Sequence, residues 1–165
     1  MQAQIINGDI TAIEQLPCFN PNALNSISQC CNCRGSAGRG LALSLRKKYP
    51  QAFEDYKQLC EQYKDTPKSL LGTVQVVMVQ DNIAVCNMFG QLEYGTQHRQ
   101  LNYEALYLGL EYQANAAKND PNMEFYYPYK MGSDLAGGNW EIVLGMINAL
   151  FKDLSNKVYI VRLVQ

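Results

Sequence analysis

A strand-to-helix turn decides the fold class of this sequence: Asn32-Cys33-Arg34-Gly35-Ser36-Ala37-Gly38-Arg39-Gly40-Leu41-Ala42. Residues 26–33 have no helical period and indicate a buried strand. From Gly38 onward apolar residues recur at helical spacing, and the helix should stop before Pro50 because the residue preceding a proline avoids helical dihedral angles. Backbone N–H groups at such a turn are unpaired, and the helix dipole favours an anion beside them. The stretch therefore predicts an α/β domain with an anion-binding loop.

A second glycine-rich turn has the same context: Gly132-Ser133-Asp134-Leu135-Ala136-Gly137-Gly138-Asn139-Trp140. It follows a strand predicted at 123–128 and precedes a helix predicted from Trp140. Two such loops at one edge of a sheet would hold a diphosphate from both sides, whereas glycines at helix starts can also serve packing alone. A P-loop is disfavoured because no Gly-Lys-Ser/Thr ends the first turn, and a dinucleotide fingerprint because Leu43 stands where its third glycine would be.

The other elements alternate between strand and helix. Further strands are predicted at 4–10, 72–79, 83–89 and 157–163, and helices at 51–63 and after a cap at Asn102. Residues 81–82 indicate a hairpin turn. The helix from Trp140 should bury one apolar stripe, formed by Ile142, Val143, Met146, Ile147, Leu150 and Leu154. This alternation predicts three layers around a mainly parallel or mixed sheet, in a single domain spanning residues 1–165.

Composition excludes several function classes. The chain has 165 residues, a formal net charge of −1, 47% apolar residues and 18% charged residues, which is typical of a globular domain rather than a disordered one. The near-zero charge disfavours nucleic acid as a partner. Apolar runs fall far short of the roughly 20 residues that a membrane span needs, and residues 1–4 have no basic region typical of a secretory signal. We expect a cytoplasmic monomer without a membrane partner.

The six cysteines and the one histidine are the residues from which a metal site could be built. Cys30 and Cys33 have the spacing of half a zinc site, but no second pair exists and His98 lies far along the chain. Cys30 also belongs to the predicted buried strand, where cysteine is a common small apolar filler. We therefore expect neither a metal nor a cofactor, and we prefer packing to redox chemistry for these thiols.

With Asn7-Gly8-Asp9-Ile10-Thr11 after the first strand, the two glycine-rich stretches resemble the macro domain family. The match continues through Tyr49-Pro50, Asp55-Tyr56, Cys60, Leu71-Gly72 and Asn102-Tyr103-Glu104-Ala105-Leu106, and it is most similar to the branch that includes the yeast ADP-ribose 1''-phosphate phosphatase and small phage and bacterial macro domains. The resemblance implies a three-layer α/β/α fold with about six mixed strands. It also implies that ADP-ribose, ADP-ribose 1''-phosphate or an ADP-ribosylated macromolecule binds in a cleft at one sheet edge.

The resemblance also assigns roles to residues. Asp9 would accept from the adenine amino group beside the backbone N–H of Ile10, and a turn residue is the alternative role for Asp9. The last strand offers Val161-Arg162 near the adenine, so stacking there would be aliphatic or use the guanidinium. Arg39 would contact a phosphate or stand as a solvated residue at the helix start. The implied ligand-binding residues are Asp9, Ile10, Asn32, Gly35, Ser36, Ala37, Gly38, Arg39, Gly40, Leu41, Asn87, Gly132, Ser133, Asp134, Leu135, Ala136, Gly137 and Gly138.

Family members either hydrolyse at the distal ribose or only bind. The resembling phosphatase has a histidine where this chain has Gln29, which does not titrate near neutrality. A branch that cleaves ADP-ribose from carboxylates uses an aspartate where this chain has Ala136, and a lysine that has no counterpart near Asn87. Asn32 and Asp134 remain as candidate catalytic residues, with a turn-capping role as the alternative for Asp134. The sequence thus favours a metal-independent hydrolase, an ADP-ribose 1''-phosphate phosphatase or an ADP-ribosyl hydrolase, over a reader that turns nothing over.

Overall fold

Strand β2 (Asn25–Asn32) lies inside a six-stranded sheet with the order β1-β6-β5-β2-β4-β3. The computed structural model describes residues 3–164. The other strands are β1 (Gln4–Asn7), β3 (Val74–Gln80), β4 (Ile83–Gln91), β5 (Glu124–Pro128) and β6 (Val158–Arg162). All paired strands are parallel except β3 and β4, which form an antiparallel hairpin. The predicted mixed sheet is therefore confirmed.

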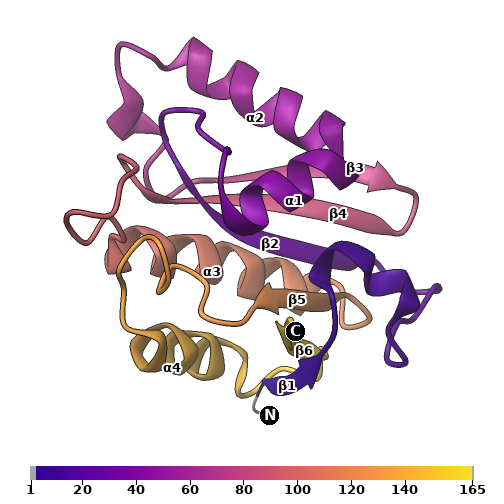
Figure 1. Cartoon of the computed structure of the whole chain (residues 1–165). Helices are drawn as coiled ribbons and strands as arrows, with labels where there is room; N and C mark the ends of the chain where they lie inside the picture. Colours follow the sequence, from indigo (N-terminus) through magenta and orange to yellow (C-terminus); the bar gives the residue numbers. More distant parts are fainter. Residues whose placement is uncertain (1–2, 165) are drawn as a thin grey trace.

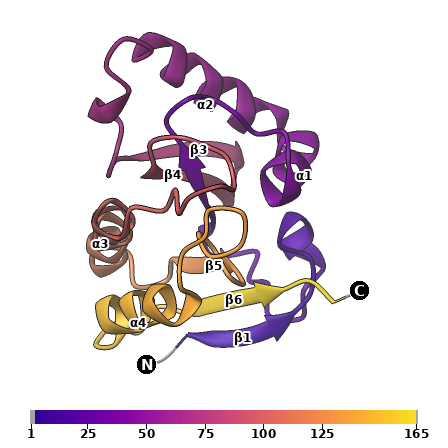
Figure 2. The same ribbon diagram turned by 60° about the vertical axis from the view of Figure 1, so that its left-hand side comes forward.

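Helices cover both faces of this sheet, as Figure 1 and the turned view in Figure 2 show. Helices α1 (Gly40–Lys48) and α2 (Pro50–Gln62) pack on one face, and α3 (Tyr103–Asn119) and α4 (Trp140–Phe151) pack together on the other. Two short 3-10 helices, η1 (Ile10–Gln15) and η2 (Pro67–Ser69), complete the described elements. The predicted three-layer α/β/α architecture is confirmed.

Short-range signals fix where the helices begin and end. Asn102 caps α3 by accepting from the Ala105 N–H at 3.0 Å, and Asn139 caps α4 by accepting from the Glu141 N–H at 2.9 Å. Helix α1 ends before Tyr49, and Pro50 begins α2 as its first residue, where its missing N–H costs nothing. The predicted start of α3 and end of α1 are therefore confirmed.

The predicted apolar stripe of α4 is confirmed except at Ile142: Val143 and Ile147 are buried, and Met146, Leu150 and Leu154 are partly buried against the same core. In α4 the buried residues are Val143, Ile147 and Phe151, whereas the predicted Ile142 is 46% exposed. This helix is apolar on almost every side, so periodicity does not fix the edges of the stripe, and packing against Phe125 and Tyr127 of β5 does. No helix among residues 3–164 combines the length and apolar character needed to cross a membrane.

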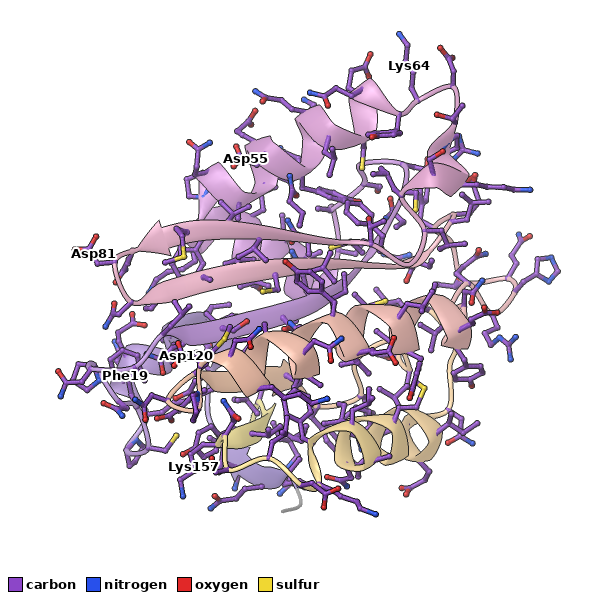
Figure 3. All side chains as sticks on the ribbon, turned by 180° about the vertical axis from the view of Figure 1, so that it is seen from behind. Phe19, Asp55, Lys64, Asp81, Asp120 and Lys157 are labelled. Atoms are coloured by element: carbon purple, nitrogen blue, oxygen red, sulfur yellow. The ribbon has the colours of Figure 1, made fainter. Side chains whose placement is uncertain are left out.

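The connections of β2 and β5 leave the sheet in opposite directions. β2 continues into α1 on one face, while β5, its parallel neighbour, continues into α4 on the other. In open α/β sheets ligands bind outside the carboxyl ends of strands at such a switch point. The turn that joins β3 to β4 lies at the other end of the strands, and Figure 3, seen from behind, shows Asp81 at its tip. The two glycine-rich loops therefore meet at the edge opposite this hairpin.

Candidate ligand-binding cleft

A cleft of about 300 Å³ lies where β2 and β5 end. The carboxyl half of β2, the N-terminus of α1 and both glycine-rich loops line it. Of the residues predicted from the sequence, those on the lining are Asn32, Ser36, Ala37, Gly38, Arg39, Gly40, Leu41, Gly132, Asp134, Leu135 and Ala136. Predicted residues off the lining are Asp9, Ile10, Gly35, Asn87, Ser133, Gly137 and Gly138. The fold thus brings the two loops together around one space.

The first loop is held by the side chain of Asn32. Its Oδ1 accepts from the N–H of Arg34 at 2.9 Å and of Ser36 at 3.2 Å, while its Nδ2 donates to the Ser36 carbonyl at 2.8 Å. The buried Tyr56 hydroxyl on α2 donates to the same Oδ1 at 2.9 Å. Asn32 lines the cleft, and these bonds make it the residue that sets the shape of the loop.

The N-terminus of α1 faces the cleft without a cap of its own. Arg39 occupies the cap position but makes no side-chain capping bond, and Gly40 has a φ of +57°, which favours glycine. Gly40, Leu41 and Ala42 form the first turn of the helix and line the cleft. Because the first N–H groups of a helix have no acceptor inside it, this turn presents donors and the positive end of the dipole to the cleft.

In the second glycine-rich loop, residues 132–138, some residues hold the loop together and others line the cleft. Ser133 donates to the Lys130 carbonyl at 2.9 Å, Gly137 to that of Asp134 at 3.2 Å, and Gly138 to that of Gly132 at 2.9 Å. These bonds tie the loop to itself, so Ser133, Gly137 and Gly138 serve its shape rather than its surface. Asp134, Leu135 and Ala136 are left on the lining.

Charge in the cleft is mostly positive. Arg39, Arg46 and Lys130 line it, against Asp134 as the one acidic residue among the lining residues. The Arg46 guanidinium carbon lies 4.0 Å from the centre of the Phe53 ring, which holds this side chain against the wall of the cleft. Three cations and a helix N-terminus suit an anionic ligand, and a diphosphate in particular.

Of the seven predicted residues off the lining, three lie outside the two glycine-rich loops. Asp9 is exposed and caps η1, because its Oδ1 accepts from the N–H and the hydroxyl of Thr11 at 2.9 and 2.7 Å. Ile10 is buried in the core between the sheet and α1. Asn87 is fully buried beneath Gln29 and does not reach the cleft. The turn role, which was the alternative for Asp9, is thus present in the structure, and the hydrogen bonds of Asn87 are internal.

Sequence reasoning missed an aromatic residue at the cleft. Tyr129 follows β5 directly and lines the cleft, with its ring packed edge-on against Trp140 at 5.5 Å between centres. The Arg162 guanidinium lies 5.7 Å from the Tyr129 ring centre. The signal was present, because an aromatic residue at the carboxyl end of a strand beside the second loop is well placed for a planar ligand. Arg46, Phe53 and Lys130 were missed as well, since only the fold turns them toward the cleft.

The thiols near the cleft are protonated groups in the core. Burial raises the pKa of both the Cys30 and Cys33 thiols to about 12, and burial raises that of Cys60 to about 11. A thiol that keeps its proton is a poor nucleophile and a poor metal ligand. Within residues 3–164 no three His, Cys, Asp or Glu side chains come together as a metal-binding group, and the six cysteines are free.

Solved structures share this architecture over almost the whole chain. A protein of unknown function from Bacteroides thetaiotaomicron matches with a TM-score of 0.81 and 27% identity, covering 99% of both chains. A macrodomain protein from Streptomyces coelicolor matches with a TM-score of 0.77 and 26% identity, over 97% of this chain and 98% of that one. This chain has the macrodomain fold. The expectation drawn from the glycine-rich stretches is confirmed.

More distant solved structures share the macrodomain fold. Curated relatives match shorter stretches of the chain in sequence. DarTG of Thermosipho africanus, solved in complex with ADP-ribose, shares the fold with a TM-score of 0.70 at 16% identity, over 98% of this chain and 42% of that one. ADP-ribose 1''-phosphate phosphatases match in sequence, at 38% identity over 56 residues in Debaryomyces hansenii and 36% over 84 in Saccharomyces cerevisiae. These matches cover 34% and 47% of this chain but only 31% and 46% of the relatives. No family model matches the chain.

Proposed function

We propose that this macrodomain binds ADP-ribose in the cleft between the two glycine-rich loops. One observation carries the proposal: the open N-terminus of α1 and the side chains of Arg39, Arg46 and Lys130 face a single space at the switch point of the sheet. A diphosphate is the group that such donors and charges suit best. A structural neighbour was solved with ADP-ribose, and the curated relatives are phosphatases of an ADP-ribose derivative, which supports the same choice.

The adenosine end of the ligand would lie toward Tyr129 and Arg162. Tyr129 supplies a ring on the lining, and Arg162 approaches that ring from the end of β6. Asp9 is close to this end, because the neighbouring Gly8 N–H donates to the Arg162 carbonyl at 3.0 Å. We therefore propose Tyr129 for adenine packing and the second carboxylate oxygen of Asp9 for the adenine amino group.

Isothermal titration calorimetry with ADP-ribose tests this function. Binding in the micromolar range, about −8 kcal/mol, is expected for the wild type. Tyr129→Ala should weaken it about tenfold. Asp9→Asn keeps an oxygen to cap Thr11 but removes an acceptor, so it should weaken binding while leaving the thermal stability unchanged. A folded protein that gives no heat with ADP-ribose, at several temperatures, would overturn the assignment of the ligand.

We further propose that the cleft hydrolyses ADP-ribose derivatives at the distal ribose. The support is that Asp134 is exposed on the lining, where a carboxylate can hold or move the proton of an attacking water. The experiment is turnover of ADP-ribosylated protein and of ADP-ribose 1''-phosphate by the wild type and Asp134→Asn. Turnover lost in the variant with binding retained supports the enzyme. Binding without turnover on either substrate supports a reader instead.

A further inference from the structure

A row of side-chain amides crosses the sheet beneath the cleft. Gln29 on β2 donates its Nε2–H to Asn87 Oδ1 on β4 at 2.8 Å. Asn87 donates its Nδ2–H to Gln75 Oε1 on β3 at 3.0 Å, and Gln75 donates its Nε2–H to the backbone carbonyl of Asp55 on α2 at 3.0 Å. The row therefore runs from the floor of the cleft across β2, β4 and β3 to the backbone of α2.

The direction of these bonds is fixed at the far end. A backbone carbonyl only accepts, so the Gln75 nitrogen must face Asp55 and its oxygen must face Asn87. The Asn87 nitrogen must then face Gln75, which leaves the Asn87 oxygen to face Gln29. Turning any one amide over would set two oxygens or two N–H groups against each other in a buried place.

A second donor supports the same direction. The Cys31 thiol lies 3.7 Å from Asn87 Oδ1, and burial raises its pKa well above the ordinary value, so it remains an S–H donor at neutral pH. Asn87 Oδ1 thus receives two hydrogen bonds from the cleft side. Asn87 is fully buried, so it has no water with which to exchange these partners.

We infer that this row turns Gln29 so that its Oε1 is a fixed hydrogen-bond acceptor at the floor of the cleft. Gln29 lines the cleft, its nitrogen is committed to Asn87, and its oxygen has no partner among the residues that the structure describes. The group beside it should therefore be a donor, such as a sugar hydroxyl or a water. A phosphate dianion has only acceptor oxygens, and it would face an oxygen there.

The inference rests on the proposed function, and it narrows the substrate class. The proposed adenosine end lies at Tyr129 and Arg162, at the ends of β5 and β6, whereas Gln29 lies on β2 and bonds toward β4 on the other side. The distal ribose would therefore lie near Gln29. A free hydroxyl at that ribose would donate to Gln29 Oε1. A terminal phosphate would instead place its acceptor oxygens against Gln29 Oε1, with no hydrogen between them. The cleft should then select ADP-ribose with free ribose hydroxyls over ADP-ribose 1''-phosphate. Gln29 is the residue that sets this selectivity, and Asn87 and Gln75 are positioning residues for it.

The test compares the dissociation constants of ADP-ribose and ADP-ribose 1''-phosphate. The wild type should bind ADP-ribose at least tenfold more tightly. Gln29→His introduces an N–H that can donate to the phosphate, so the ratio of the two constants should fall at least fivefold. Gln75→Met removes the acceptor of the Asn87 Nδ2–H and so cuts the row on the edge strand, without replacing a residue that lines the cleft. It should lower the ratio in the same direction. Gln58→Leu, an exposed residue of α2 away from the cleft, should leave the ratio unchanged.

The outcomes separate this inference from the proposed function. If the folded wild type binds neither ligand, the proposed function fails. If it binds ADP-ribose but binds the 1''-phosphate equally or more tightly, the inference alone is overturned. A preference for ADP-ribose that survives in both Gln29→His and Gln75→Met also overturns it, because the selectivity then has another source. The inference is supported if the preference for ADP-ribose over the 1''-phosphate falls in Gln29→His and in Gln75→Met and is unchanged in Gln58→Leu.

Discussion

The hydroxyl of Tyr56 donates to Asn32, at 2.8 Å to its backbone carbonyl and at 2.9 Å to its Oδ1. This contact joins the middle of α2 to the end of β2, two elements that the chain separates by the whole first loop and α1. Both partners are buried, so a polar atom that lost this bond would have little access to water in its place. The first loop is therefore held in place by α2, a helix that does not follow a glycine-rich turn.

Removing this hydroxyl should loosen the loop. In Tyr56→Phe the ring still stacks on Phe89, at 5.9 Å between centres, but Asn32 loses one donor. The free energy of unfolding should fall by about 1 kcal/mol, and ADP-ribose should bind more weakly. Urea denaturation and calorimetry measure the two effects. Tyr63→Phe, at the partly exposed end of the same helix, should change neither, and an equal loss there would contradict the account.

Arg46 should contribute to affinity through its charge. Arg46 lines the cleft over Phe53, whereas the neighbouring Lys47 on α1 is exposed and does not line it. Arg46→Met should weaken ADP-ribose binding about tenfold, which corresponds to about 1.4 kcal/mol, and should reduce its dependence on salt. Lys47→Met removes the same charge from the same helix and should leave the affinity within about twofold. Equal losses in the two variants would show that only the overall charge matters.

Gly138 should be irreplaceable, in contrast to Gly145. A Cβ at Gly138 would meet Leu101 and would lie 2.5 Å from the backbone oxygen of Gly132, whereas nothing lies within 4 Å of a Cβ at Gly145. Gly138→Ala should lower the free energy of unfolding by about 1–3 kcal/mol and disturb the second loop. Gly145→Ala lies inside α4 and should raise stability by about 0.5–1 kcal/mol. Thermal unfolding of the two variants checks the contrast, which an equally stable Gly138→Ala would refute.

Alkaline pH should destabilise the protein through its thiols. Cys30 and Cys33 have folded-state pKa values of about 12 against an ordinary value of 9.0, because burial penalises the thiolate. Above pH 9 the unfolded chain releases these protons while the folded protein retains them, so the free energy of unfolding should fall as the pH rises from 9 toward 12. Below pH 9 this contribution is fully present.

Denaturation under reducing conditions, at about pH 8 and about pH 10, measures this slope. Between pH 9 and 10 the thiols dominate this dependence, because buried tyrosines respond at higher pH. The Tyr49 hydroxyl, for example, has an ordinary pKa of 10.0, which burial raises to about 12. Cys33→Ala removes one of the groups and should make the dependence on pH shallower. A free energy of unfolding that stays constant between the two pH values would contradict the burial of these thiols.

Local sequence determined the boundaries and the order of the elements. Pro50 separates α1 from α2, and Asn102 and Asn139 begin α3 and α4, because caps and prolines act on backbone groups within a few residues. The two glycine-rich turns were located in the same way, since each sits between an apolar strand and a periodic helix. The sequence alone thus indicated the sheet, its three layers and the edge at which the cleft lies.

Only the tertiary structure decided which side chains face one another. Packing against β5 leaves Ile142 outside the buried stripe of α4, because a helix that is apolar on almost every side does not fix the edges of its buried face by itself. Arg46 of α1 and Lys130 after β5 line the same cleft only because the fold brings these elements together, which no short-range pattern encodes. The pair Asn32–Tyr56 and the row from Gln29 to Asp55 join residues of separate elements, and their hydrogen bonds exist only because β2, β3, β4 and α2 pack in this order.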